Sequence, residues 1–189
     1  DEGASSVTIS YGDGPDSNNQ TASMSLGVIN TGGGDLSLYT TANEGGSASR
    51  EDINFGGTVN AGAGRIYTEG REISQSAPIT ASEMLIDATA SVTLNTAGND
   101  VDTLAADLGS AGSGDSFTFI DDGTDGLTVG TVFTWGKIKT TDGNITLNTN
   151  GGNLNLEDTA AIIDAGDGDV TMTASSNISA AGDTAYIYS

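Results

Sequence analysis

The chain has 189 residues and carries only 5 Lys and Arg against 26 Asp and Glu, which gives a formal net charge of −21. Binding to nucleic acid or to an anionic membrane surface is therefore not expected, because both need a basic surface. The chain contains neither cysteine nor histidine, which excludes disulfides, thiolate or imidazole metal sites and the commonest general base. No apolar run approaches the roughly 18 residues of a membrane helix, so membrane insertion is not expected either.

The N-terminal segment, residues 1–27, contains a short strand pattern. Val7, Ile9 and Tyr11 alternate with polar residues and should share one face of a strand, because strand side chains have a period of two. The segment matches the later repeats poorly. We therefore predict an N-terminal strand or cap segment over residues 1–27 and repeats over residues 28–189.

A longer pattern recurs three times, in residues 28–38, 58–68 and 162–172. It reads aliphatic, Asn or Asp, Ala or Thr, Gly, any residue, Gly, any residue, aliphatic. The second and third copies also continue in a similar way, so that residues 71–74 correspond to residues 176–179. Glycine supplies the positive φ of tight turns, and repeated units of short strands indicate a β-solenoid.

The pattern breaks in an irregular insertion around residues 98–126. Val101, Leu104, Ala105 and Leu108 fall near helical spacing. They predict one or two turns of helix, with a corner between strands as the alternative.

Residues 140–175 contain three units in which a glycine turn precedes an alternating strand. Leu147 and Leu154 occupy the apolar phase of two such strands and are predicted to stack in the interior. Gly143 and Gly168, each at the start of a unit, lie 25 residues apart, which is the length expected of one solenoid coil. We predict an all-β fold, a right-handed parallel β-helix (β-solenoid) with irregular coils and little helix.

Several stretches carry a family resemblance: VNAGAG (59–64), APITAS (77–82), SVTLNTAGNDVDTLAA (91–106), DGLTVG (125–130) and TTDGNITLNTNGGNLNL (140–156). The run from about Val59 to Gly182 resembles the repetitive passenger regions of large bacterial surface proteins. These include filamentous-haemagglutinin-like adhesins and autotransporter-type passengers. The resemblance implies a right-handed parallel β-helix displayed outside the cell as an adhesin, a matrix component or a stalk.

Two acidic turns offer the one candidate for a bound ion. Ca²⁺ takes carboxylate and carbonyl oxygens, and turns of this kind supply both. The alternative, which we favour, is that these groups are solvated turn carboxylates, and no other cofactor is predicted. The candidate Ca²⁺ ligands are Asp121, Asp122, Asp125, Asp164, Asp167 and Asp169.

The expected function is structural: an extracellular protein of a bacterial surface or matrix that self-associates into filaments. The alternative is an adhesin module, part of a giant surface protein, that binds glycans or host surfaces. A polysaccharide-acting enzyme could use paired carboxylates, but the few basic residues are scattered, so we do not expect an enzyme.

End-to-end association is predicted from strand patterns near both ends of the sequence. The chain begins with Asp1, not Met, so a fragment of a longer protein is the competing interpretation. The predicted partner is a second copy of the chain, or other surface components, because an open sheet edge templates another strand. The predicted assembly residues are Val7, Ile9, Tyr11, Tyr186, Ile187 and Tyr188.

Overall fold

The computed structural model describes residues 6–12, 23–41, 50–109, 111–157, 162–180 and 186–189. Within these residues every regular element is a β-strand and no helix occurs, which confirms the all-β prediction. Accordingly, no described segment forms a helix of the length and apolarity that crossing a membrane requires.

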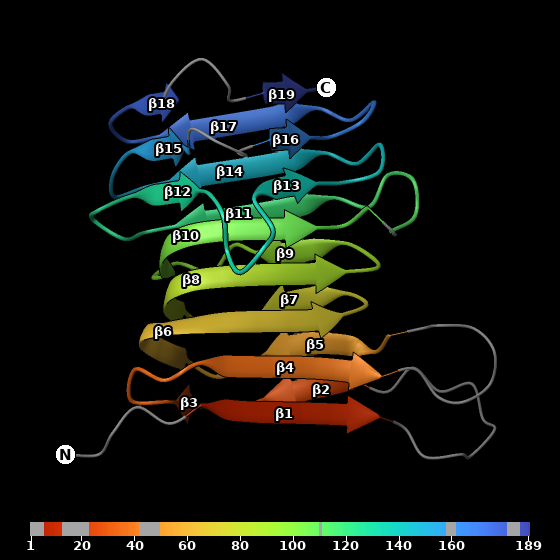
Figure 1. Ribbon diagram of the computed structural model, residues 1–189, viewed down its shortest axis with the longest axis vertical. Helices are drawn as coiled ribbons and strands as arrows, with labels where there is room; N and C mark the ends of the chain where they lie inside the picture. Colours follow the sequence, from red (N-terminus) through yellow and green to blue (C-terminus); the bar gives the residue numbers. More distant parts are fainter. Residues whose placement is uncertain (1–5, 13–22, 42–49, 110, 158–161, 181–185) are drawn as a thin grey trace.

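The strands form two sheets (Figure 1). The twelve-stranded sheet contains β1 (Val7–Gly12), β3 (Ile29–Asn30), β4 (Leu36–Thr41), β6 (Val59–Gly70), β8 (Ile79–Ala88), β10 (Asp100–Asp107), β12 (Leu127–Val129), β13 (Lys137–Lys139), β15 (Leu154–Leu156), β16 (Ile162–Asp164), β18 (Ile178–Ala180) and β19 (Tyr186–Tyr188). The seven-stranded sheet contains β2 (Ser23–Leu26), β5 (Asp52–Phe55), β7 (Ile73–Gln75), β9 (Val92–Leu94), β11 (Phe117–Asp121), β14 (Ile145–Thr149) and β17 (Val170–Ala174).

The pairings between these strands are all parallel. The chain passes from a strand of one sheet to a strand of the other and back, and each pass lies beside the previous one along the long axis (Figure 1). In the seven-stranded sheet the step between paired residues ranges from 19 (Ile73 to Val92) to 29 (Met24 to Ile53). Sequence repeats of about this length therefore correspond to one complete pass through both sheets.

The core lies between the sheets and consists of apolar rows that cross successive strands. Ile53, Ile73, Val92, Phe117 and Ile145 stand in register along one row and are at most 1% exposed. Alternation of side chains sends every second residue inward, and each fully buried aliphatic or aromatic side chain contributes about 1.5–3 kcal/mol. One inward row thus stabilises several strands at once.

The predicted interior positions of Leu147 and Leu154 are confirmed. Both side chains are 0% exposed. Leu147 stands between Phe119 and Met172, and Leu154 stands between Leu127 and Ile178. The period-two phase of these strands was therefore sufficient to assign their inward faces.

The helix predicted near residues 101–108 is wrong, because this segment forms strand β10. Val101 and Leu104 face the central core, but Ala105 is also fully buried although it lies outside that core. Consecutive burial of Leu104, Ala105 and Ala106 removes the alternation expected of a half-exposed strand. The apolar spacing then resembles that of a helix.

The three copies of the sequence pattern do not occupy equivalent places. Residues 28–38 and 58–68 lie along the twelve-stranded sheet, in β3, β4 and β6. Residues 162–172 instead cross from β16 in that sheet to β17 in the other. The predicted correspondence of residues 71–74 with 176–179 is wrong for the same reason, since β7 and β18 belong to different sheets. Gly62 and Gly166 both have positive φ. The copies therefore share a backbone conformation that favours glycine, although they occupy different places in the sheets.

A buried asparagine, Asn99, forms hydrogen bonds that link successive passes of the chain. Asn99 is 0% exposed, and its Nδ2 donates hydrogen bonds to Gln75 Oε1 (2.9 Å) and to the carbonyl of Ile120 (2.9 Å). Its Oδ1 accepts from Gln75 Nε2 (2.8 Å) and from the backbone N–H of Ile79 (3.0 Å). A buried amide is tolerated here because its polar atoms are satisfied.

Candidate functional site

An open pocket lies on the outer face of the twelve-stranded sheet, over β4, β6 and β8. Ser37 of β4 is in register with Tyr67 of β6, and Tyr67 with Leu85 of β8, so their side chains form one outward row. Tyr39, the next outward residue of β4, places a second ring beside that row. With Phe133 these residues line a cavity of about 250 Å³.

Phe133 reaches the pocket because the chain leaves the sheet between β12 and β13. Strand β10 pairs with β12 as far as Leu104 and Val129, and it pairs with β13 from Ala106 and Ile138 onward. Residues 130–136 therefore form an excursion, which lies over β10 and β8 in Figure 1.

The excursion is a small antiparallel hairpin with Phe133 in its turn. The backbone N–H groups of Val132 and Trp135 donate to each other's carbonyls at 2.8 and 3.0 Å. Trp135 Nε1 donates to the carbonyl of Ala106 (3.3 Å), and the ammonium of Lys137 lies 4.4 Å from the centre of the Trp135 ring system. These contacts fix the hairpin on the sheet, while Phe133 stays 47% exposed.

The aromatic rings of the pocket meet at steep angles. The ring centroids of Tyr39 and Tyr67 are 5.2 Å apart with planes at 58°, and those of Tyr67 and Phe133 are 6.2 Å apart with planes at 77°. The guanidinium carbon of Arg65 lies 5.2 Å from the centroid of Phe133, and Arg65 also forms an ion pair with Glu83 (3.5 Å). The rings therefore form the walls of a concave site.

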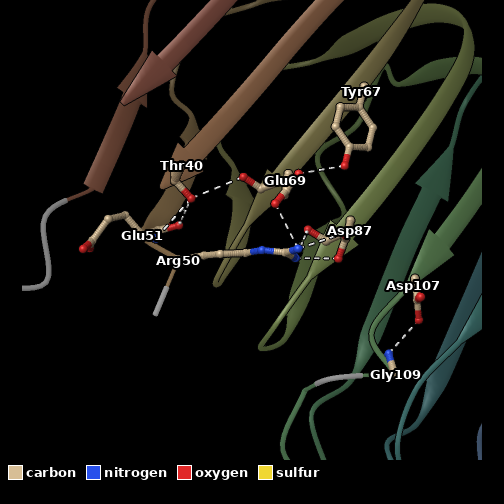
Figure 2. Close-up of polar contacts among 8 residues, drawn as sticks. All are labelled: Thr40, Arg50, Glu51, Tyr67, Glu69, Asp87, Asp107 and Gly109. Atoms are coloured by element: carbon tan, nitrogen blue, oxygen red, sulfur yellow. Dashed lines mark hydrogen bonds and ion pairs between the residues drawn. The ribbon is translucent and has the colours of Figure 1, made fainter. Parts of the chain in front are cut away.

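A row of carboxylates borders the pocket, with Glu69, Asp87 and Asp107 in register on successive strands. Figure 2 shows Arg50 between the first two of them. Its Nη2 lies 3.0 Å from Glu69 and 3.0 Å from Asp87, and its Nη1 also binds Asp87. Asp107 accepts a hydrogen bond from the N–H of Gly109 (2.8 Å; Figure 2). Like charges in register repel, and Arg50 offsets this repulsion.

The pocket and the row are joined by a hydrogen bond from Tyr67 Oη to Glu69 (2.9 Å; Figure 2). Burial, then this hydrogen bond and the charge of Glu69, raise the pKa of Tyr67. Burial alone would lower the pKa of Arg50, but the hydrogen bond to Asp87 and the charges of Asp87 and Glu69 outweigh it and raise that pKa. At neutral pH Tyr67 is thus a neutral donor and Arg50 is charged.

One carboxyl group points into the protein. Asp121 ends β11 and is fully buried; its Oδ1 accepts the N–H of Val101 (3.1 Å), and its Oδ2 has no hydrogen-bond partner among the described residues. Burial is the main cause that raises the pKa of Asp121 to about 7, and the charges of Asp100 and Asp125 act in the same direction. In the folded protein this group is protonated below neutral pH.

Proton binding by Asp121 makes a testable contribution to stability. The side chain of an unfolded Asp has a pKa of about 3.9. Between about pH 4 and the folded-state pKa of about 7, Asp121 therefore binds a proton in the folded protein that it releases in the unfolded chain. The contribution of Asp121 is full below about pH 4 and is lost as pH rises through about 7, at no more than about 1.4 kcal/mol per pH unit. Asp121→Asn cannot ionise, so its stability relative to wild type should rise from pH 5 to pH 8.

Urea unfolding at several pH values measures this difference. Asp167→Asn, which makes the same chemical change at an exposed position, is the matched control. A difference between Asp121→Asn and wild type that stayed constant from pH 5 to pH 8 would contradict the assignment.

The candidate Ca²⁺ ligands of the first turn are separated by the structure. Asp121 is internal, and Asp122 accepts hydrogen bonds from the N–H of Gly98 and from Asn150 Nδ2. Asp125 instead meets Asp100 and Asp102, with one carboxylate oxygen of each within 4.8 Å of the others. Burial, then the charges of Asp125 and Asp100, raise the pKa of Asp102. Exposed carboxylates in such a group are potential ligands for a hard cation.

Sequence reasoning missed Asp100 and Asp102. The signal was the Asp-Val-Asp alternation of residues 100–102, which places both carboxylates on one face of a strand. The predicted helix in this region concealed it.

The other candidates lie near the turn between β16 and β17, with separate partners. Asp164 lies 4.0 Å from the ammonium of Lys139 and accepts the N–H of Gly166 (3.2 Å). Asp167 and Asp169 are exposed, and their backbone N–H groups donate to side chains of the preceding turn. Within the described part of that turn, no three carboxylates lie close enough together to share an ion.

The predicted assembly residues lie on the first and last strands, β1 and β19. Val7 and Ile9 pack against the core, whereas Tyr11 is 38% exposed, Ile187 46% and Tyr188 53%. The side chain of Tyr186 lies outside the described residues. Ile187 and Tyr188 are therefore more exposed than Val7 and Ile9.

Comparison of the chain with protein-family models, with curated proteins and with solved structures finds no match.

Proposed function

We propose that the chain is a right-handed parallel β-helix with irregular coils that serves as an extracellular structural protein and associates end to end. Three features support the β-helix: parallel pairing throughout the named strands, alternation between two sheets, and steps of 19 to 29 residues between neighbouring strands of the seven-stranded sheet. In such an architecture each coil covers the inward apolar side chains of its neighbour. An end coil therefore exposes side chains that are buried in the other coils.

The observation that carries end-to-end association is the exposure of inward rows at the last described strands. Leu154 and Ile163 are 0% exposed, whereas the residues in register with them on the next strands, Ile178 and Ile187, are 47% and 46% exposed. These two positions have the inward phase but lack a covering layer among the described strands. A further strand in register would bury both.

The first strand of a second copy has the matching pattern. Val7 and Ile9 of β1 begin the rows that continue through Leu36 and Leu38 of β4. Addition of β1 to an exposed strand edge would extend both the hydrogen bonds and the apolar rows. Because this contact joins different surfaces of the two copies, it repeats into a filament unless it closes into a ring.

The location on a bacterial surface or in its matrix rests on the resemblance of about residues 59–182 to surface-protein passengers. The net charge of −21 is consistent with this role, since it limits lateral clumping of neighbouring filaments. Other surface components are the alternative partners in that setting.

Sedimentation velocity of the 189-residue chain at increasing NaCl tests the proposal. Screening of the acidic surface should shift the protein from monomers to larger species, and negative-stain images should show unbranched fibres. Parallel samples with CaCl₂ at matched ionic strength show whether divalent cations act beyond screening. A monodisperse monomer at high concentration in every condition would reject self-association.

Two variants separate the end contact from general charge effects. Ile187→Asp places a carboxylate in the exposed inward row and should abolish assembly. Thr93→Asp adds the same charge at an exposed residue of β9, which is paired on both sides, and it should leave assembly unchanged. Equal assembly of both variants would show that the row of Ile187 is not the contact.

A further inference from the structure

We propose that the pocket lined by Tyr39, Tyr67, Leu85 and Phe133 binds an organic cation with a quaternary ammonium group, of which the choline head group is the simplest probe. The proposal goes beyond the structural role and does not depend on it. The pocket lies on the outer face of β4, β6 and β8, which are paired on both sides, whereas assembly would use the free edges of the first and last strands.

The size and shape of the pocket suit a small head group. Its volume of about 250 Å³ lies below the roughly 300–1,000 Å³ of pockets for drug-sized ligands. The ring planes meet at 58° and 77°, so the rings enclose a concave space and do not form the flat platform on which an extended sugar chain stacks. Ring faces carry negative electrostatic potential and attract alkylammonium groups.

The hydrogen bond of Tyr67 strengthens this attraction. Tyr67 Oη donates to the carboxylate of Glu69 at 2.9 Å. A phenol that donates to an anion gains electron density in its ring, so the ring face becomes more negative. A phenol is protonated at neutral pH and so keeps this hydrogen bond there, and the raised pKa of Tyr67 extends that range to higher pH.

The charge around the pocket selects a cation over an anion. Three carboxylates, Glu69, Glu83 and Asp87, face two guanidinium groups, Arg50 and Arg65, which pair with them. The local excess is negative, in keeping with the net charge of −21, and an anionic ligand would be repelled. Arg65, which does not line the cavity, already lies over Phe133 and shows that this ring accepts a cation.

Phe133 supplies an independent observation. Its φ is 56°, in the left-handed region that is a true outlier for a bulky residue. The hairpin holds this strained conformation, and the ring it presents is 47% exposed at the pocket. Strain of this kind persists where the surroundings impose it and collects at binding sites.

Isothermal titration of the full chain with choline chloride, at constant ionic strength set with NaCl, tests the proposal. The matched neutral ligand is 3,3-dimethyl-1-butanol, which replaces the ammonium nitrogen of choline by carbon. We expect choline to bind at least about tenfold more tightly than this isostere. Equal affinities, no binding of choline, or tighter binding of a neutral disaccharide such as cellobiose would each overturn the proposal.

Variants assign the binding to the pocket. Phe133→Gly removes the ring but suits a positive φ, so choline affinity should fall at least about tenfold while Tm changes by only a few degrees. Tyr67→Phe keeps the ring, loses the bond to Glu69 and should weaken binding a few-fold. Tyr11→Leu, an exposed tyrosine outside the lining, is the control and should bind choline normally. Unchanged affinity in Phe133→Gly would refute the assignment even if another variant failed to fold.

Discussion

Replacement of Leu147 by aspartate is expected to lower the free energy of unfolding by about 5 kcal/mol or more, enough to unfold much of the protein. Leu147 is fully buried between Phe119 and Met172, which stand directly in register on the neighbouring strands. The substitution removes apolar contacts on both sides. It also buries a carboxyl group in a row that offers it no polar partner. Urea unfolding followed by circular dichroism measures the loss.

The neighbouring residue provides the control for this prediction. Asn148→Asp introduces the same charge one position along β14, on the outward face, where the side chain is partly exposed. It should change the free energy of unfolding by less than about 1 kcal/mol. Similar losses in the two variants would mean that net charge, and not burial in the row, determines the outcome.

Substitution of Gly126 by alanine is the second change with a large expected effect, a loss of about 3 kcal/mol. Gly126 has φ of +85°, and a Cβ atom there would lie 2.2 Å from the carbonyl oxygen and 2.5 Å from the nitrogen of Asn153, on the next pass of the chain. The backbone conformation therefore disfavours any side chain, and the close approach of the next pass leaves no room for one. Thermal and urea unfolding of Gly126→Ala should both show the loss.

Gly114 separates these two causes. Its φ of +92° is similar, but nothing lies within 4 Å of an added Cβ. Gly114→Ala should therefore lose only the conformational part, about 1–2 kcal/mol. If both alanine variants lost the same stability, the backbone at Asn153 would be able to move and accommodate the added methyl group.

The strand phase was readable from the sequence because it is a local property. Alternation of apolar and polar residues specifies which side chains face inward wherever one face of a strand is solvated. This is why Leu147 and Leu154 were assigned correctly, and why the all-β class followed from short alternating units between glycine turns. The lengths of the repeats similarly anticipated the 25-residue step from Ile145 to Val170.

The same rule failed at β10, where a distant segment covers the outer face. Ala105 and Val132 are fully buried but do not belong to the central core. The hairpin of residues 130–136 lies over this part of the sheet (Figure 1). The hydrogen bond from Trp135 to the carbonyl of Ala106 anchors it there. With both faces of the strand buried, alternation disappears, and no local pattern distinguishes such a strand from a helix.

Tertiary structure alone decided the pocket and the approach of Asp125 to Asp100 and Asp102. Tyr39, Tyr67 and Phe133 are far apart in the sequence, and they meet because parallel register places β4 beside β6 and because the excursion returns over the same face. Asp125 meets Asp100 and Asp102 through the stacking of one corner on the preceding strand. Alternation specifies the face of a strand on which a side chain lies, but the register between strands and the path of a loop depend on contacts between distant residues.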